Sequence, residues 1–260
     1  MSVPQLSVEI LDHIFSFLAS DRDTLAFCSK DPLLGPIVER HFYSHLTVHM
    51  GLVNLESNHA FRPIRLLKFL IENPHIPHYV KTLEILDGLD YQQKIPSKHL
   101  KVLHEFQKTL LMYPVLECVM LKATPNGRLW HLSDSFRVAL ERLVNLPTVK
   151  EVHFVDFPLS LLDNCKGIKK LLISGLQGCI YAQICHPTLP QLTSLTLPDR
   201  NCSSSTFAWL NDHINELRFL KCGSLWVLEE LVEACAGTLT KLDVEILDSC
   251  RKIQLSFNCQ

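Results

Sequence analysis

The chain has 260 residues, of which 47% are hydrophobic and 20% are charged, and its formal net charge is −2. This composition is typical of a globular protein and excludes a disordered chain. The charge balance, with no basic run longer than Lys169–Lys170, argues against binding to nucleic acid or to a membrane surface. No stretch approaches the ~20 apolar residues that a membrane span needs.

The sequence predicts an intracellular protein, in the cytoplasm, the nucleus or both. Its first residues show no basic segment followed by an apolar core, so no secretory signal is expected. The ten cysteines are expected to be free thiols, because reducing compartments disfavour disulfides.

The first 48 residues are expected to begin with a short amphipathic helix. Ser7 is a suitable helix N-cap, and Glu9 places a negative charge in the first turn, where it favours the helix dipole. An apolar stripe then follows at spacings of three and four residues, formed by Ile10, Leu11, Ile14, Phe15 and Leu18.

Two further short helices are expected in the same segment. The spacing Ser20-x-x-Asp23 is typical of a helix cap and predicts a second helix carrying Leu25 and Cys28. Gly35–Pro36 breaks the chain and puts proline in the first turn of a third helix that runs toward Phe42.

One strand motif, apolar-x-x-apolar-x-apolar, recurs after these helices. Its copies are Tyr43–Leu46–Val48, Val80–Leu83–Ile85, Leu116–Val119–Leu121, Val149–Val152–Phe154, Ile168–Leu171–Ile173, Leu192–Leu195–Leu197, Ile214–Leu217–Phe219 and Leu239–Leu242–Val244. The last three spacings, of 24, 22 and 25 residues, fit a leucine-rich repeat, whose units run ~20–29 residues, and the longer early spacings leave room for fuller helices. A last strand at Cys250–Ile253–Leu255 follows too closely for a helix, which predicts a terminal hairpin.

Helices are expected between several of the strands. Apolar spacing predicts them over 64–71, from Ser97 to Leu110, from Ser133 to Leu143, and from Ser224 to Cys235. Alternation of strands and helices favours parallel strands joined by right-handed crossovers. The predicted fold class is therefore α/β, with a curved solenoid of irregular repeats after the helical segment.

One side-chain position in each strand points to the face opposite the core, because successive residues of a strand alternate. It lies between the last two apolar residues of the motif and is filled by Glu84, Met120, His153, Leu172, Thr196, Arg218 and Asp243. This mixture of charges and sizes is typical of a protein-binding surface. The alternative is that these are ordinary solvated strand positions.

The helical segment resembles an F-box. The resemblance is carried by Leu6-x-x-Glu9–Ile10–Leu11-x-x-Ile14–Phe15–Ser16–Phe17–Leu18, followed by Asp23–Thr24–Leu25-x-x-Cys28. The following His41–Phe42–Tyr43-x-x-Leu46-x-Val48 resembles the exit of fungal-type F-box proteins into a leucine-rich-repeat-like region. It implies an F-box-like helical module over 1–48 and a leucine-rich-repeat-like solenoid over 49–260.

The resemblance also implies a function: the substrate-recruiting subunit of a Skp–cullin–F-box (cullin–RING) ubiquitin ligase. The module would bind the Skp-type adaptor, and through it cullin, while the repeats would bind an unknown protein substrate. At the matched positions the adaptor contacts would be Leu6, Ser7, Ile10, Leu11, Ile14, Leu25 and Cys28. The alternative is a non-enzymatic repeat scaffold whose helices only cap the solenoid, which would bury Leu6, Ile10 and Ile14.

No catalytic or cofactor-binding motif is evident in the sequence. Gly175–Leu176–Gln177–Gly178 lacks the spacing and the basic residue of a phosphate-binding loop, and no Cys-x-x-Cys pair suggests a RING domain. The histidines of 41–49 and 75–78 lack convergent partners in the sequence, so no metal site is expected. We therefore expect no enzyme and no cofactor, with a hydrolase or metal enzyme hidden in an irregular repeat as the weakest alternative.

Overall fold

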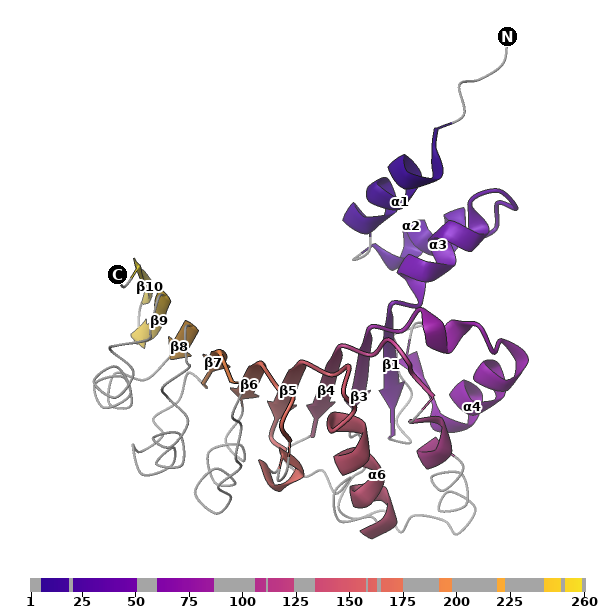
Figure 1. The fold of residues 1–260 in the computed structure, drawn as a ribbon. Helices are drawn as coiled ribbons and strands as arrows, with labels where there is room; N and C mark the ends of the chain where they lie inside the picture. Colours follow the sequence, from indigo (N-terminus) through magenta and orange to yellow (C-terminus); the bar gives the residue numbers. More distant parts are fainter. Residues whose placement is uncertain are drawn as a thin grey trace.

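The computed structural model describes residues 6–18, 21–50, 60–86, 106–110, 112–123, 134–157, 159–162, 165–174, 192–197, 219–222, 241–248 and 251–258. Three helices come first, and a ten-stranded sheet with helices on one side follows (Figure 1). This arrangement confirms the mixed α/β class. Among the described residues, no helix has the length and apolarity required to cross a membrane.

The three N-terminal helices are α1 (Val8–Phe17), α2 (Arg22–Cys28) and α3 (Gly35–Phe42). As predicted, the Ser7 hydroxyl caps α1, accepting a hydrogen bond from the Ile10 amide at 3.4 Å, and proline lies in the first turn of α3. The predicted cap of α2 was wrong by one residue. The Asp21 carboxylate performs this role, accepting a 3.0 Å hydrogen bond from the Thr24 amide, because an aspartate at this position reaches the free amide three residues ahead.

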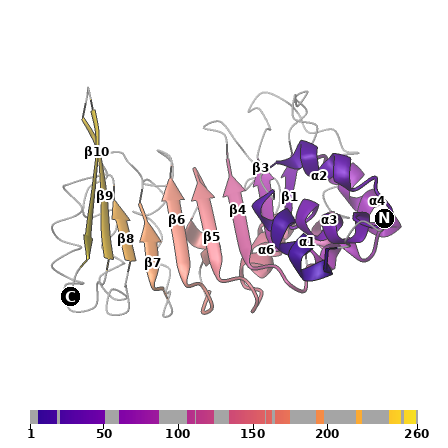
Figure 2. The same ribbon diagram turned by 90° about the horizontal axis from the view of Figure 1, so that it is seen from above.

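The strands follow one another across the sheet almost in chain order (Figure 2). Neighbours run parallel from β2 through β9, and β10 is antiparallel to β9, which confirms the terminal hairpin. The short β2, which the sequence did not predict, lies outside β1 at the sheet edge. The strands are β1 (His45–His49), β2 (Ala60–Phe61), β3 (Thr82–Leu86), β4 (Cys118–Lys122), β5 (Glu151–Val155), β6 (Lys170–Ser174), β7 (Ser194–Thr196), β8 (Phe219–Cys222), β9 (Lys241–Asp248) and β10 (Arg251–Asn258).

Strands β1 and β3 to β6 bury alternate residues on one face, and the residues between them are partly exposed on the other. The buried face lies toward α4 (Pro63–Glu72) and α6 (Asp134–Val144), both of which the apolar spacing predicted (Figure 1). Two short 3-10 helices, η1 (Ile76–His78) and η3 (Leu159–Leu162), and a helical segment over 106–109 also lie between strands. We call the other side of the sheet the open face. The predicted helix that begins at Ser224 lies outside the described residues.

The register of β8 corrects one part of the repeat prediction. Leu195 pairs with Leu220, and Thr196 pairs with Lys221, so this copy of the motif lies three residues later than expected. The segment 214–222 satisfies the apolar pattern in both registers, and strand pairing selects the later one. Lys221, not Arg218, therefore occupies the expected row of the open face.

The described residues form two separate apolar cores. Phe15, Leu25, Ile37 and Val38 make the small core of the helical head, which we define as residues 6–43. The larger core runs along the sheet and includes Leu46 of β1. Strand β1, which the predicted boundary at residue 48 assigned to the helical module, thus packs with the sheet.

Polar and aromatic contacts join the head to the sheet. The Arg22 guanidinium donates a hydrogen bond to the backbone carbonyl of His45 and lies 5.5 Å from the centre of the Phe42 ring. The rings of Tyr43 and Phe69, on α4, lie 5.2 Å apart. Partial burial lowers the pKa of Arg22, an effect that nearby Glu84 opposes. The junction thus rests on residues outside the α1 stripe.

Candidate functional site

Exposed apolar side chains gather on the head. Leu6, which precedes the Ser7 cap, is 52% exposed, and Ile10 and Ile14 of α1 are 49% and 41% exposed. Ile10 and Ile14 are four residues apart, so they share one side of the helix; we call these three residues the α1 stripe. Helix α1 packs on α3 through its other side, where Phe15 is buried. Further exposed apolar side chains on the head are Val8, Phe17, Phe27 and Leu33.

The residues expected to contact an adaptor separate into two groups. Leu6, Ser7, Ile10 and Ile14 are exposed; Leu6 and Ser7 immediately precede α1, and Ile10 and Ile14 lie on it. Leu11 and Cys28 are only partly exposed, because they pack against the core of the head.

Leu25 corrects the predicted contact set. Its side chain is 0% exposed, because it belongs to the core that holds the head helices together. It therefore stabilises the head and offers no area to a partner. Sequence periodicity alone could not separate it from the exposed stripe, because α2 is only seven residues long.

The second candidate surface is the open face. Strand pairing places Thr47, Glu84, Met120, His153, Leu172 and Thr196 in one row, each beside its neighbour. The row continues along the backbone to Lys221 and Asp243. The structure therefore brings together the described residues expected on this surface; Arg218 lies outside the described residues.

Glu84 is the most strongly paired residue of this row. Its carboxylate lies 2.5 Å from the Lys122 ammonium, accepts a 3.0 Å hydrogen bond from the Thr47 hydroxyl, and lies 3.3 Å from Nε2 of His45. The bond with His45, followed by the interactions with Lys122 and Thr47, lowers the pKa of Glu84 to about 2, although partial burial opposes this. This carboxylate already has partners within the sheet.

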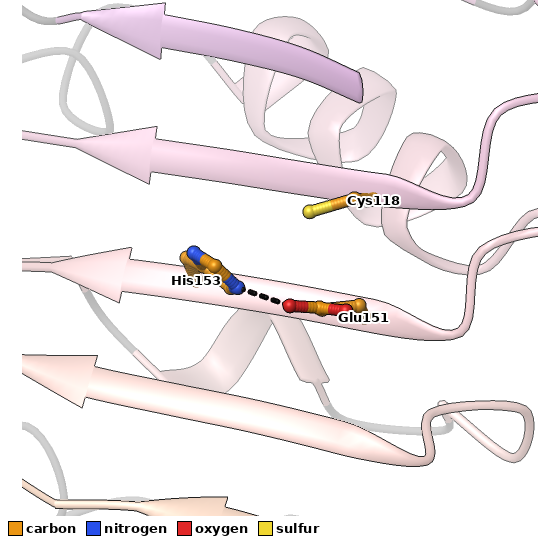
Figure 3. Close-up of side chains that lie close together, drawn as sticks. All are labelled: Cys118, Glu151 and His153. Atoms are coloured by element: carbon orange, nitrogen blue, oxygen red, sulfur yellow. Dashed lines mark hydrogen bonds and ion pairs between the residues drawn. The ribbon is translucent and has the colours of Figure 1, made fainter. Parts of the chain in front are cut away.

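A second cluster lies on the next strands, β4 and β5, and contains Cys118, Glu151 and His153 (Figure 3). Nε2 of His153 lies 2.7 Å from Oε1 of Glu151, and the ammonium of Lys170 lies 3.4 Å from Oε2. One possible ligand atom from each residue of the trio lies within 4.8 Å of the other two.

The two ionisable neighbours on β4 and β5 have opposite pKa shifts. Burial raises the pKa of the Cys118 thiol to about 12, and the nearby Glu151 carboxylate adds to the effect. Partial burial opposes ionisation of Glu151, but His153 and Lys170 outweigh it and lower the pKa of this carboxyl. At neutral pH the cluster therefore holds a thiol beside a carboxylate.

The sequence prediction missed this trio, although the repeat alignment contained a signal for it. Cys118 and Glu151 each stand one residue before the second apolar residue of their motif, so alignment of the copies puts them side by side. The histidines considered from sequence lie elsewhere: His41 contacts Asp12 at 3.0 Å, and His45 contacts Glu84.

Comparison with known proteins adds no assignment. No protein-family model, no curated protein and no solved structure matches this chain. Functional inference consequently rests on the head and on the open face.

Proposed function

We propose that this chain is the substrate-recruiting subunit of a Skp–cullin–F-box ubiquitin ligase. In this proposal the helical head acts as an F-box-like module that binds the Skp-type adaptor and, through it, cullin. The chain from β1 onward acts as an irregular leucine-rich-repeat-like solenoid whose open face binds an unidentified protein substrate. The chain would contribute no catalytic residue, because it only brings a substrate lysine close to another enzyme.

The exposed stripe of α1 is the observation that carries the proposal. Leu6, Ile10 and Ile14 are each more than two fifths exposed, and these same positions carry the resemblance to the F-box. Contiguous exposed apolar residues on a soluble domain are typical of a protein-binding site. An amphipathic helix that presents such a stripe can bind a partner through a few buried anchors.

The alternative, a scaffold whose helices only cap the repeats, is less well supported. It requires the α1 stripe to be covered by the sheet, whereas the head meets the sheet through Arg22 and Tyr43. In Figure 1 the helices α2 and α3 stand between α1 and the strands.

The open face suits the second part of the proposal. Its central row combines acidic, basic, hydroxyl, imidazole and apolar residues, so it favours a protein partner over an anionic polymer. We propose that the row positions of Glu84, Met120, His153 and Asp243 contact the substrate, with the register giving the Arg218 position of the row to Lys221.

A calorimetric titration with purified Skp-type adaptor tests the first part. The double variant Ile10→Asp, Ile14→Asp should weaken binding roughly 100-fold or more. Loss of two half-exposed isoleucines removes about 1 kcal/mol each, and an unpaired carboxylate in an apolar interface costs at least as much again. Ile71→Asp is the matched control, because Ile71 is 72% exposed on α4.

Circular dichroism must show the same folded signal for all three proteins. Binding by the parent and by Ile71→Asp, with loss in the double variant, would support the adaptor-binding role. A folded parent that does not bind the adaptor would exclude the ligase assignment and leave the scaffold as the better explanation. Equal weakening by both variants would show that α1 is not the contact surface.

A further inference from the structure

We propose that Cys118, Glu151 and His153 form a zinc-binding site on the open face of the sheet. The inference is independent of adaptor binding, because the three residues lie on β4 and β5 and the proposed adaptor contacts lie on the head. It also departs from the expectation, drawn from sequence, that the chain has no metal site.

The backbone places the three side chains together. Cys118 pairs directly with Glu151 in the parallel register of β4 and β5, and His153 pairs with Met120 two residues further on. Residues two apart in a strand share a face, so Glu151 and His153 project to the same side as Cys118. Figure 3 shows Cys118 on one strand and Glu151 and His153 on its neighbour, with the three side chains close together.

The donor set fits zinc. Thiolate sulfur, imidazole nitrogen and carboxylate oxygen are the three protein ligands that Zn²⁺ uses, typically in tetrahedral geometry. Binding of the ion would displace the thiol proton of Cys118 to solvent and leave the thiolate as its ligand. Zinc–ligand bonds of about 2.0–2.3 Å put such donors about 3.3–3.6 Å apart. The ligand atoms already lie within 4.8 Å of one another, little more than the separation that a bound zinc ion would impose.

Three protein ligands leave a fourth coordination position. Because the trio lies on the open face, this position can take water or a side chain from a bound protein. An ion here would also link β4 to β5 on the side of the sheet opposite the helices.

Replacement of Lys170 tests the proposal in the opposite direction, because it should strengthen zinc binding. Its ammonium lies 3.4 Å from Oε2 of Glu151, and its side chain is 62% exposed, so it can turn toward solvent when a cation binds. A positive charge so close to the site must still weaken the binding of a dication. Lys170→Gln should therefore tighten zinc binding, roughly three- to tenfold.

The experiment is a titration of the full, metal-free chain with Co²⁺, followed by displacement with Zn²⁺. Co²⁺ substitutes for zinc and gives a thiolate-to-metal charge-transfer absorption when a cysteine is a ligand. We expect this absorption in the parent and in Cys165→Ser, which removes a buried thiol elsewhere in the sheet core. We expect its loss in Cys118→Ser.

His153→Gln and Glu151→Gln should each weaken Zn²⁺ binding at least tenfold, and thermal unfolding followed by circular dichroism checks that each variant is folded. No charge-transfer absorption in the parent, or the same absorption in folded Cys118→Ser, would overturn the proposal. If Cys118→Ser does not fold, the zinc affinities of the other variants test the proposal. Unchanged zinc affinity in folded His153→Gln, or weaker binding in Lys170→Gln, would equally overturn it.

Discussion

Replacement of Glu84 by glutamine should destabilise the protein at neutral pH and have a smaller effect in acid. The side chain of Glu84 is 13% exposed, and its carboxylate interacts with Lys122, Thr47 and His45 from the strands β4 and β1 on either side of β3. Glu84→Gln keeps the shape of the side chain and removes only the charge that these neighbours stabilise.

The magnitude follows from the pKa of Glu84. These partners lower it from 4.5 to about 2, and a difference of this size between the unfolded and folded states corresponds to about 3 kcal/mol at neutral pH. Solvent still reaches the network, so screening reduces the expected value to about 2 kcal/mol. Because the folded pKa is depressed, this stabilisation is present above pH 4.5 and is lost as the pH falls toward 2.

Urea unfolding at pH 7 and pH 3 measures the effect. The difference in unfolding free energy between the parent and Glu84→Gln should be about 2 kcal/mol at pH 7 and about half as large at pH 3. Glu72→Gln is the matched control, because the Glu72 side chain is 59% exposed and its carboxylate forms a long, 3.7 Å ion pair with Lys68; it should change stability by less than about 0.5 kcal/mol. The reasoning would be refuted by a difference below that of the control, or by one that does not shrink in acid.

Two further predictions concern the head core and a turn of the sheet. Leu25→Ala removes a fully buried side chain of the head, so it should destabilise the head by about 2–5 kcal/mol; amide hydrogen exchange should show faster exchange in α1 to α3 than in β3 to β6, and uniform protection would contradict the assignment of separate cores. Asp156, directly after β5, has a φ of 54°, which β-branched residues adopt poorly, so Asp156→Val should lower the free energy of unfolding by about 1–2 kcal/mol more than Asp156→Gly does. Equal thermal stability of these two variants would refute the argument from backbone conformation.

Local patterns predicted much of the fold. The α1 cap at Ser7, the proline in the first turn of α3, the helix over 64–71 and the terminal hairpin all follow from short-range rules, and the structure confirms each of them. The strand motif also gave the correct pairing of Leu46, Leu83, Val119 and their equivalents as far as β7. These features depend on residues within one turn or one strand, which is why the sequence sufficed.

Sequence patterns could not decide the register of β8 or which apolar side chains of the head are buried, because more than one arrangement fits the local pattern. The segment before Cys222 fits the strand motif in two registers, and only pairing with β7 and β9 places Lys221 in the open-face row. Leu25 and Ile10 are both apolar residues on short helices, yet one is buried and the other is half-exposed because of how three helices pack.

The sequence by itself determined the helical head, the repeated strands and the alternation that buries one face of each strand, because these follow from periods of 3.6 and 2 residues. Tertiary structure decided which side chains from distant segments meet. Asp12 of α1 and His41 of α3 are 29 residues apart in the chain, but packing of α1 on α3 brings their side chains to 3.0 Å. Contact between two helices depends on how they are placed against each other, and the apolar period within either helix does not contain that information.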